Sequence, residues 1–172
     1  METGTSDTVA FLLAQLGHRA ATLFAEQMAT LELTPPHAGI LRAIGSQPGL
    51  SQQSLSTQLS LLPSRVVNYV DDLEDRGYVE RRRNPDDRRL HALFLSTAGK
   101  KTLRRIGELA HRHDERMTMG LDAAQRENLR SLLQTLADQH ELTPHVHPGF
   151  RNLGRAGAQR GAQPARLHLP TT

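Results

Sequence analysis

The chain has no cysteine and no tryptophan among its 172 residues, and aromatic residues make up only 3% of it. Without cysteine, disulfides, thiolate metal sites and cysteine redox sensing are excluded. No stretch approaches the roughly 20 apolar residues of a membrane span, and the first residues lack the basic segment of a signal peptide. We therefore expect a cytoplasmic protein without a membrane partner. The apolar residues are mostly leucine and alanine, which favours helices over a β-sandwich.

Basic charge is concentrated at the C-terminus. Residues 143–172 contain four arginines and no acid, whereas the whole chain has a formal net charge of +3, so residues 1–142 carry −1. Any argument for nucleic-acid binding therefore depends on where the arginines lie and not on net charge. Because residues 143–172 are rich in Gly, Pro, Arg and Ala and have no apolar periodicity, they are predicted to form a disordered basic tail.

Helical spacing of apolar residues predicts six helices. The first is long, over 7–31, and the second follows the cap Thr34 and ends at Gln47-Pro48-Gly49. The third begins after Ser51, and the fourth runs from Pro63 to about Arg76. Two more helices lie within 97–140. The residues predicted to begin or end helices are Thr34, Ser51, Pro63, Gly77, Ser96, Gly120 and Asp122.

A β-hairpin is predicted between the fourth and fifth helices. Tyr78 to Arg82 and Leu90 to Leu95 alternate as strands, and Asn84-Pro85-Asp86-Asp87 forms the turn. Two short helices joined by a tight turn indicate a helix-turn-helix, and a hairpin directly after it is a wing. The predicted fold class is thus mainly α (α+β), with a winged helix-turn-helix over 34–95. The flanking helices, 7–31 and 97–140, have apolar stripes outside this core, so we expect them to form a helical dimerisation region.

Residues 33–101 resemble the MarR family of transcriptional regulators. The most specific parts are LEDRGYVERRRNPDDRR and LFLSTAG, in which a helix ending in L-x-x-x-G precedes a wing tip of the form N-P-x-D-x-R. With its flanking helices, the resemblance covers about residues 7–140 and defines an expected domain of residues 7–142. It implies a homodimer that binds a near-palindromic operator in double-stranded DNA, usually as a repressor. It also implies a small anionic or phenolic effector bound between the DNA-binding and dimerisation parts.

The fourth helix is the expected recognition helix, whose front enters the major groove. Arg65 can contact guanine and Asn68 adenine, whereas the acids farther along the helix would repel phosphate. By the family pattern, Arg89 enters the minor groove. Arg88, on the opposite side of the hairpin, would contact a phosphate or pair with an acid. Asp87 is expected to support the wing. Residues 62–89 hold equal numbers of acids and bases, so a solvated mixed-charge surface is the alternative. The expected DNA-binding residues are Ser51, Gln52, Pro63, Ser64, Arg65, Asn68, Arg81, Arg83, Arg88 and Arg89.

Histidines suggest chemistry other than DNA binding. An effector pocket is expected under the recognition helix, lined by the first helix, the second helix and the start of the fifth, with His18, Arg19, His37, Ile40 and Leu41 as candidates. Zinc sensing is the alternative function, but His111 and His113 are two residues apart, whereas helical ligands prefer three or four. His113 falls on an apolar stripe and is expected in a core or interface. No cofactor is expected, and no phosphate loop, nucleophile elbow or zinc-protease motif indicates an enzyme. A winged helix that binds only proteins is the remaining alternative.

Overall fold

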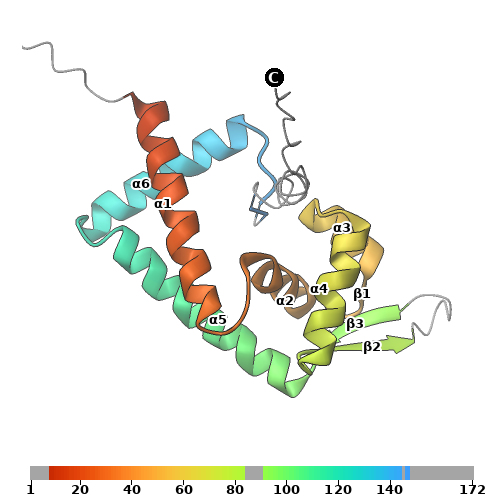
Figure 1. Cartoon of the computed structure of the whole chain (residues 1–172). Coiled ribbons are helices and arrows are strands. Elements are labelled where there is room, and N and C mark those ends of the chain that lie inside the picture. The colour runs from red at the N-terminus through yellow and green to blue at the C-terminus, as the bar shows by residue number, and fades with distance from the viewer. Residues whose placement is uncertain (1–7, 84–90, 145, 148–172) are drawn as a thin grey trace, which may run out of the picture.

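Helices and a small three-stranded antiparallel sheet form the part of the chain described by this computed structural model, residues 8–83, 91–144 and 146–147. The predicted fold class is confirmed. The structure adds one short strand to the predicted order of helices and strands. The elements are α1 (Val9–Ala29), α2 (Pro35–Ser46), β1 (Leu50–Ser51), α3 (Gln52–Leu59), α4 (Pro63–Asp75), β2 (Val79–Arg83), β3 (His91–Leu95), α5 (Thr97–Met117) and α6 (Ala123–Gln139) (Figure 1).

Side-chain caps begin several helices where the sequence predicts them. Ser51 Oγ accepts a hydrogen bond from the backbone N–H of Ser54 at 3.0 Å, which starts α3. At α6, Asp122 and Gln125 bond each other's backbone N–H at 2.8 and 2.9 Å, the reciprocal pattern of a capping box. Gly77, just after α4, has φ +70°, a conformation that glycine adopts without the steric cost of a Cβ.

The hydrophobic core centres on α2, which packs against every other layer of the winged helix-turn-helix. Its Ile40, Leu41 and Ile44 are fully buried. Around them lie apolar side chains from α3, α4, the sheet and α5, so the two helices of the helix-turn-helix share one core with the wing. These surrounding residues include Leu55, Leu59, Val66, Val70, Leu73, Leu93 and Ile106.

Two hydrogen bonds between Ser56 and Leu61 stabilise the turn between α3 and α4. The hydroxyl of Ser56 donates to the carbonyl of Leu61 at 2.7 Å, and the N–H of Leu61 donates to the carbonyl of Ser56 at 3.1 Å. Ser60 between them adopts a left-handed conformation with φ +52°. This closed turn sets the angle between α3 and α4, and with it the position of the front of α4.

The wing is an antiparallel hairpin with a third, two-residue strand at its side. β2 pairs with β3 from Val79↔Leu95 to Arg83↔His91, and β1 pairs with β3 at Leu50↔Leu93. The sequence analysis missed β1, because a two-residue strand has no periodicity of its own. Its pairing places the start of α3 directly beside the wing.

A tight joint connects the wing to α5. Ser96 Oγ donates to the carbonyl of Gly77 at 2.6 Å and accepts from the N–H of Gly99 at 2.9 Å. A Cβ built on Gly99 would lie 2.0 Å from the carbonyl oxygen of Tyr78, so only glycine allows the first turn of α5 to approach this close. The joint explains Ser96 and Gly99 within the local sequence Leu-Ser-Thr-Ala-Gly and fixes the direction in which α5 leaves the DNA-binding part.

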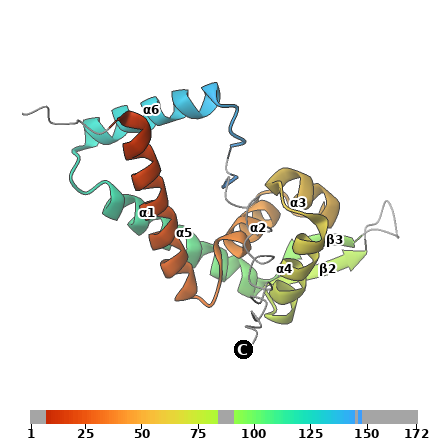
Figure 2. The ribbon, with the colours of Figure 1, turned by 45° about the horizontal axis from the view of Figure 1, so that its top comes forward.

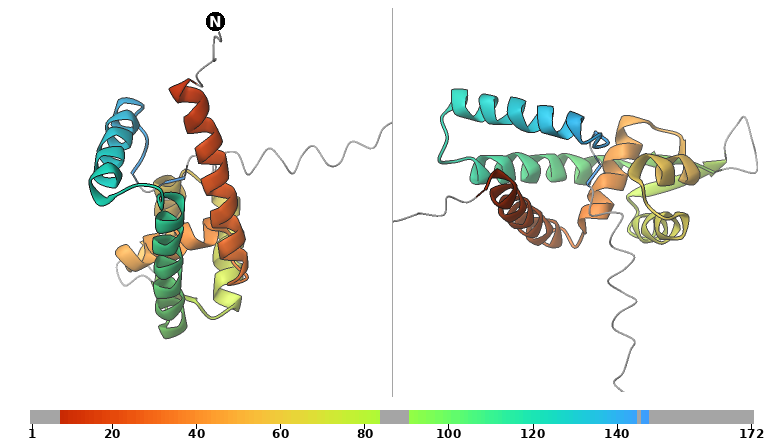
Figure 3. Two further views of the ribbon diagram at one scale, coloured as in Figure 1. Left: turned by 90° about the vertical axis from the view of Figure 1, so that its left-hand side faces the viewer. Right: turned by 90° about the horizontal axis from the view of Figure 1, so that it is seen from above.

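Helices α1, α5 and α6 extend to one side of the winged helix-turn-helix. In Figure 1, α5 and α6 diverge from the turn that joins them and α1 crosses them; Figures 2 and 3 show the same helices from other directions. α1 packs on α5 and α2, but α6 buries none of its residues. Large apolar side chains therefore stay exposed on the first half of α1 and along α6: Val9, Phe11, Leu12, Leu13, Leu16, Leu129, Leu132 and Leu133.

The segment after α6 turns back toward the winged helix-turn-helix. Thr143 and Pro144 line a cavity with residues of α2 and α3, and Val146 is partly buried against the core. Residue 145 and residues 148–172 of the predicted tail lie outside the described residues, so the disorder of the tail and its boundary at residue 142 stay predictions. Within the described part of the chain, no helix is long and apolar enough to span a membrane.

Candidate DNA-binding interface

The front of α4 presents polar side chains to solvent while its other face is buried. Val66, Val70 and Leu73 pack in the core, as predicted. Pro63, Ser64 and Asn68 are exposed and Arg65 is partly exposed. A guanidinium and a carboxamide at a helix front are the groups that contact guanine and adenine edges in a major groove.

A groove of about 460 Å³ runs between the starts of α3 and α4 and the wing. It brings together four of the predicted DNA-binding residues, Ser51, Gln52, Pro63 and Arg81. Gln53, Val67 and His91 complete its lining. Residues distant in sequence thus form one concave surface, because the pairing of β1 with β3 holds the start of α3 against the hairpin.

Arg81 has a structural position that the sequence analysis did not anticipate. Its guanidinium forms ion pairs with Asp71 and Glu74 of α4, and its backbone N–H donates to Glu74 at 3.3 Å. With the amide oxygen of Gln52 turned toward it, Arg81 also donates from Nε at 3.1 Å and from Nη2 at 2.8 Å. These carboxylates raise the pKa of Arg81 against the opposing effect of its burial, so it stays charged. Arg81 therefore joins the wing, α3 and α4.

The neighbouring arginines face away from this cluster or lie toward the wing tip. Arg82 points to the opposite face of the hairpin, where it stacks on Phe94 and pairs with Glu80 at 2.8 Å. Arg83 is exposed at the end of β2. Asp87, Arg88 and Arg89 lie outside the described residues, so their assigned roles remain predictions.

His37 is buried and connects α2 to α4. The backbone N–H of Thr34 donates to its Nδ1 at 3.1 Å, and its Nε2 lies 3.1 Å from Asp72, without the alignment of a hydrogen bond. Its ring also meets Tyr69 edge to face, with centroids 4.9 Å apart. Burial lowers the pKa of His37 more than the nearby Asp72 carboxylate raises it, so the ring is neutral at pH 7. His37 thus acts as a helix cap and a packing partner of the recognition helix.

The five residues expected to line an effector pocket occupy other positions. Ile40 and Leu41 are in the core, His37 packs on α4, and His18 and Arg19 are exposed on α1. None of them lines the groove between α3, α4 and the wing or the cavity between α1, α2 and α5. A cavity of about 550 Å³ does lie between the three helices that were expected, α1, α2 and α5, but other faces of these helices line it. Its lining residues include Phe24, Ala38, Arg42, Leu103, Ile106 and Ala110.

Histidines do not gather into a metal site in the part of the chain that the structure describes, where no three His, Asp or Glu side chains converge. His111 is exposed and pairs with Glu115 at 3.4 Å. His113 is partly buried beside Phe24, with ring centroids 5.7 Å apart, as expected from its place on the apolar stripe. Its Nδ1 is buried without a hydrogen-bond partner among the described residues.

Two apolar residues at the front of α4 escaped the sequence analysis. Val67 is 39% exposed and Leu62, just before the helix, is 60% exposed. Both lie beside the polar residues of this surface, where an apolar side chain can contact the methyl group of thymine. The helical period could have identified Val67, because inward positions at 66, 70 and 73 turn residue 67 outward.

Comparison with known proteins agrees with this geometry. The model of the MarR family matches residues 31–90. A protein of Thauera aromatica described as a transcriptional regulator of the hcr operon is 35% identical over 122 residues, which cover 70% of this chain and 74% of that protein. The regulator BilQ of Clostridium symbiosum is 32% identical over 98 residues, covering 57% of this chain and 68% of BilQ.

Solved structures show the same fold. The repressor CouR, bound to a 23-mer DNA duplex, is 34% identical, with a TM-score of 0.67 over 80% of this chain and 98% of CouR. MarR of Escherichia coli has a TM-score of 0.68 at 23% identity, over 76% of this chain and 97% of that one. Members of this family regulate transcription and are not enzymes. The chain belongs to the MarR family of winged-helix transcriptional regulators.

Proposed function

We propose that the protein is a homodimeric, ligand-responsive repressor that binds a near-palindromic operator. The observation that carries the proposal is the groove between α3, α4 and the wing, with Arg65 and Asn68 beside it at the front of α4. A symmetric dimer presents two such surfaces, and each recognition helix contacts one half-site. The relative CouR, a repressor with its structure determined on duplex DNA, supports this reading.

Base contacts are assigned to the front of α4. Arg65 donates to guanine and Asn68 to adenine, while Val67 contacts a thymine methyl group. The C-terminal part of the helix is unsuited to phosphate contact, because its acidic residues Asp71, Asp72 and Glu74 would repel a phosphate. Only the N-terminal part of α4, up to Asn68, therefore enters the groove.

The wing arginines divide into two roles. Arg81 positions the wing through Asp71 and Glu74, whereas Arg83, Arg88 and Arg89 contact DNA. Arg89 is assigned to the minor groove, where a narrow A·T-rich segment attracts an arginine by its negative potential. Arg88 is assigned to a phosphate.

The homodimer is supported by apolar side chains that one protomer leaves uncovered. Val9, Phe11 and Leu16 are 69%, 50% and 56% exposed on α1, and Leu132 is 57% exposed on α6. Two helices that expose such side chains at the same end of a molecule resemble half of an obligate interface. We assign α1 and α6 to the dimer interface, with α5 connecting it to the wing.

The effector is assigned to the cavity of about 550 Å³ between α1, α2 and α5. Its lining is mainly apolar, and Arg42 places one cation in it, which suits an aromatic or phenolic anion. Because α2 belongs to the DNA-binding part, a ligand in this cavity changes the position of one recognition helix relative to that of the other protomer. A regulator of this kind works where bacterial chromosomal DNA is held, so we assign the protein to the cytoplasm.

Selection from a random-duplex library tests the proposal. The expected result is enrichment of a near-palindrome whose half-sites lie about one helical turn apart. Arg65→Ala should enrich the same spacing with one base position relaxed in each half-site. The matched control is Arg105→Ala, which removes an exposed arginine from the middle of α5 and should return the wild-type sequence. Failure to enrich any sequence would contradict the proposal.

A further inference from the structure

The chain reverses direction after α6 and lies against the DNA-binding part. Glu141 adopts a left-handed conformation with φ +51°, and the N–H of Leu142 donates to the carbonyl of Ala137 at 3.0 Å, which closes the helix. A second turn follows, in which the N–H of Val146 donates to the carbonyl of Thr143 at 3.2 Å. Figures 1 and 2 show this segment between α6 and the helices α2 and α3.

An anchor segment holds the chain on α2 and α3. It consists of Thr143, Pro144, Val146 and His147. Val146 is partly buried against the hydrophobic core. The first three anchor residues line a cavity of about 250 Å³ together with Gln58 and Leu59, at the end of α3. The anchor therefore fixes where residues 148–172 begin.

This anchor lies beside the turn that leads into the recognition helix. Leu59 lines the anchor cavity and Pro63 lines the proposed DNA-binding groove, and only three residues separate them. Four residue steps span at most about 14 Å. Arg151 follows His147 by the same four steps, so an arginine beyond the anchor can reach DNA that lies on the front of α4.

The sequence beyond the anchor carries positive charge alone. Residues 148–172, which we call the arginine segment, contain no Asp, Glu or Lys, and their four arginines are Arg151, Arg155, Arg160 and Arg166. Residues 1–142 carry a net charge of −1, so the arginine segment supplies positive charge that the rest of the chain lacks. Duplex DNA presents one negative charge about every 1.7 Å along its axis.

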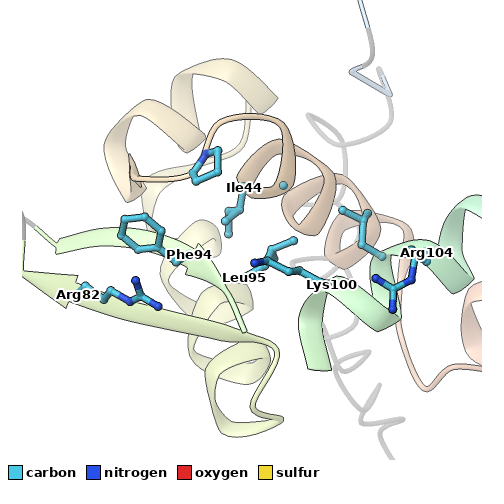
Figure 4. Close-up of a pocket in the computed structure, with 9 residues that line it drawn as sticks. Ile44, Arg82, Phe94, Leu95, Lys100 and Arg104 are labelled. Atoms are coloured by element: carbon cyan, nitrogen blue, oxygen red, sulfur yellow. The ribbon is translucent and has the colours of Figure 1, made fainter. Parts of the chain in front are cut away.

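Several cations among the described residues face away from the proposed DNA-binding groove. Arg81 pairs with two carboxylates of α4. Figure 4 shows Arg82, Lys100 and Arg104 around a different cavity, of about 590 Å³, between the end of α2, the hairpin and the start of α5. Successive side chains of a strand point to opposite faces, so Arg82 and this cavity lie on the face of the hairpin opposite Arg81. Additional cations for DNA phosphates would therefore come from the arginine segment.

We propose that the arginine segment binds phosphates of the duplex that the recognition helix contacts, and that the anchor holds the segment beside this duplex. The inference rests on the proposed DNA binding. Phosphates carry no sequence information, so the segment adds affinity and salt dependence without changing the preferred operator. Attachment beside the recognition helix raises the effective concentration of the arginines at the DNA.

The acidic part of α4 is the competing occupant. There Asp72 already pairs with Arg76 at 2.9 Å, and Asp71 and Glu74 pair with Arg81. Duplex DNA offers a far denser array of negative charge, which favours it as the partner. If the arginine segment covered α4 instead, removal of its charges would strengthen DNA binding.

The test compares full-length variants on the selected operator and on a random-sequence duplex of equal length, by fluorescence anisotropy at several salt concentrations. The test variant is Arg151→Gln/Arg155→Gln/Arg160→Gln/Arg166→Gln. The matched control removes four exposed cations of α5 and is Lys101→Gln/Arg105→Gln/Arg112→Gln/Arg116→Gln. Val146→Asn disturbs the anchor and keeps every arginine. Thermal unfolding and sedimentation confirm that each variant is folded and assembled like wild type.

The expected result is that the test variant binds both duplexes about tenfold or more weakly at low salt, with the salt slope lowered by at least about 1 per protomer. The control should bind like wild type. Val146→Asn should weaken binding to both duplexes, but less than the test variant does, because the arginines are kept and only their effective concentration falls.

Unchanged affinity and salt slope in the test variant overturn the proposal, as does an equal loss in the control. Stronger binding by the test variant would assign the segment to α4, and a loss confined to the operator would exclude a phosphate contact. Wild-type binding by Val146→Asn would remove the role of the anchor. If no operator can be selected, the proposed repressor fails, whereas the comparison on the random-sequence duplex still tests the arginine segment.

Discussion

Replacing Arg81 with alanine removes the side-chain ion pairs that join the wing to the recognition helix. The side chain is 20% exposed and pairs with Glu74, which is 37% exposed, and with Asp71, which is 52% exposed. A charge-assisted hydrogen bond contributes roughly 1.5–3 kcal/mol when buried, and exposed pairs contribute less than about 1 kcal/mol. Because both carboxylates are partly in solvent, we expect a coupling energy of about 1 kcal/mol between Arg81 and Glu74.

A double-mutant cycle in urea measures this coupling. It compares the free energy of unfolding of wild type, Arg81→Ala, Glu74→Gln and the double variant. The Arg82–Glu80 pair is the matched control, because it lies on the same strand at 2.8 Å but is 58% and 47% exposed. Its coupling should be below about 0.5 kcal/mol. A coupling for Arg81–Glu74 no larger than that of the control would refute the reasoning.

Measurements of DNA binding distinguish an arginine that positions the wing from an arginine that contacts DNA. Arg81→Ala should weaken binding to all sequences while leaving the slope of affinity against salt close to wild type, because no phosphate contact is lost. Arg83→Ala should lower that slope by about 1. If Arg81→Ala lowers the slope and Arg83→Ala does not, the roles of the two arginines are exchanged.

Three further predictions follow from other parts of the molecule. Gly99→Ala should lower the free energy of unfolding by about 1–3 kcal/mol in urea denaturation, because its Cβ would meet the Tyr78 carbonyl; Gly107→Ala, with open space around residue 107, is the control. Leu133→Glu should shift the protein toward monomer in sedimentation, and an unchanged dimer would exclude α6 from the interface. Acidification from about pH 7 to about pH 5 should destabilise wild type, because burial lowers the pKa of folded His37 and the unfolded chain then binds more protons. His37→Asn should lose less stability over that range, and an equal loss would mean that His37 does not titrate as described.

Local signals in the sequence predict the helices and their caps because the responsible contacts span only a few residues. Ser51 and Ser96 each bond the N–H three residues later, and Asp122 and Gln125 cap each other. The short strand β1 could not be predicted, because its two residues depend on pairing with β3.

The functional surfaces were predicted less completely because they depend on contacts between distant segments. The three helices around the proposed effector cavity were predicted, but the residues that line it were not. The helical spacing of Ile40 and Leu41 places them in the core and turns Ala38 and Arg42 toward the cavity. Likewise, the sequence showed that the acidic residues of α4 would repel a DNA phosphate. Their ion pairs with Arg81 could not be predicted, because they form only when the wing folds against α4.

We propose that the front of α4 contacts bases in each half-site of an operator. The most direct test of this proposal is the affinity of wild type and Arg65→Ala for the selected operator and for every single-base substitution in one half-site. We predict that Arg65→Ala loses about 1–3 kcal/mol of discrimination at one position and keeps it at the others. Full wild-type discrimination at every position in Arg65→Ala would contradict the account.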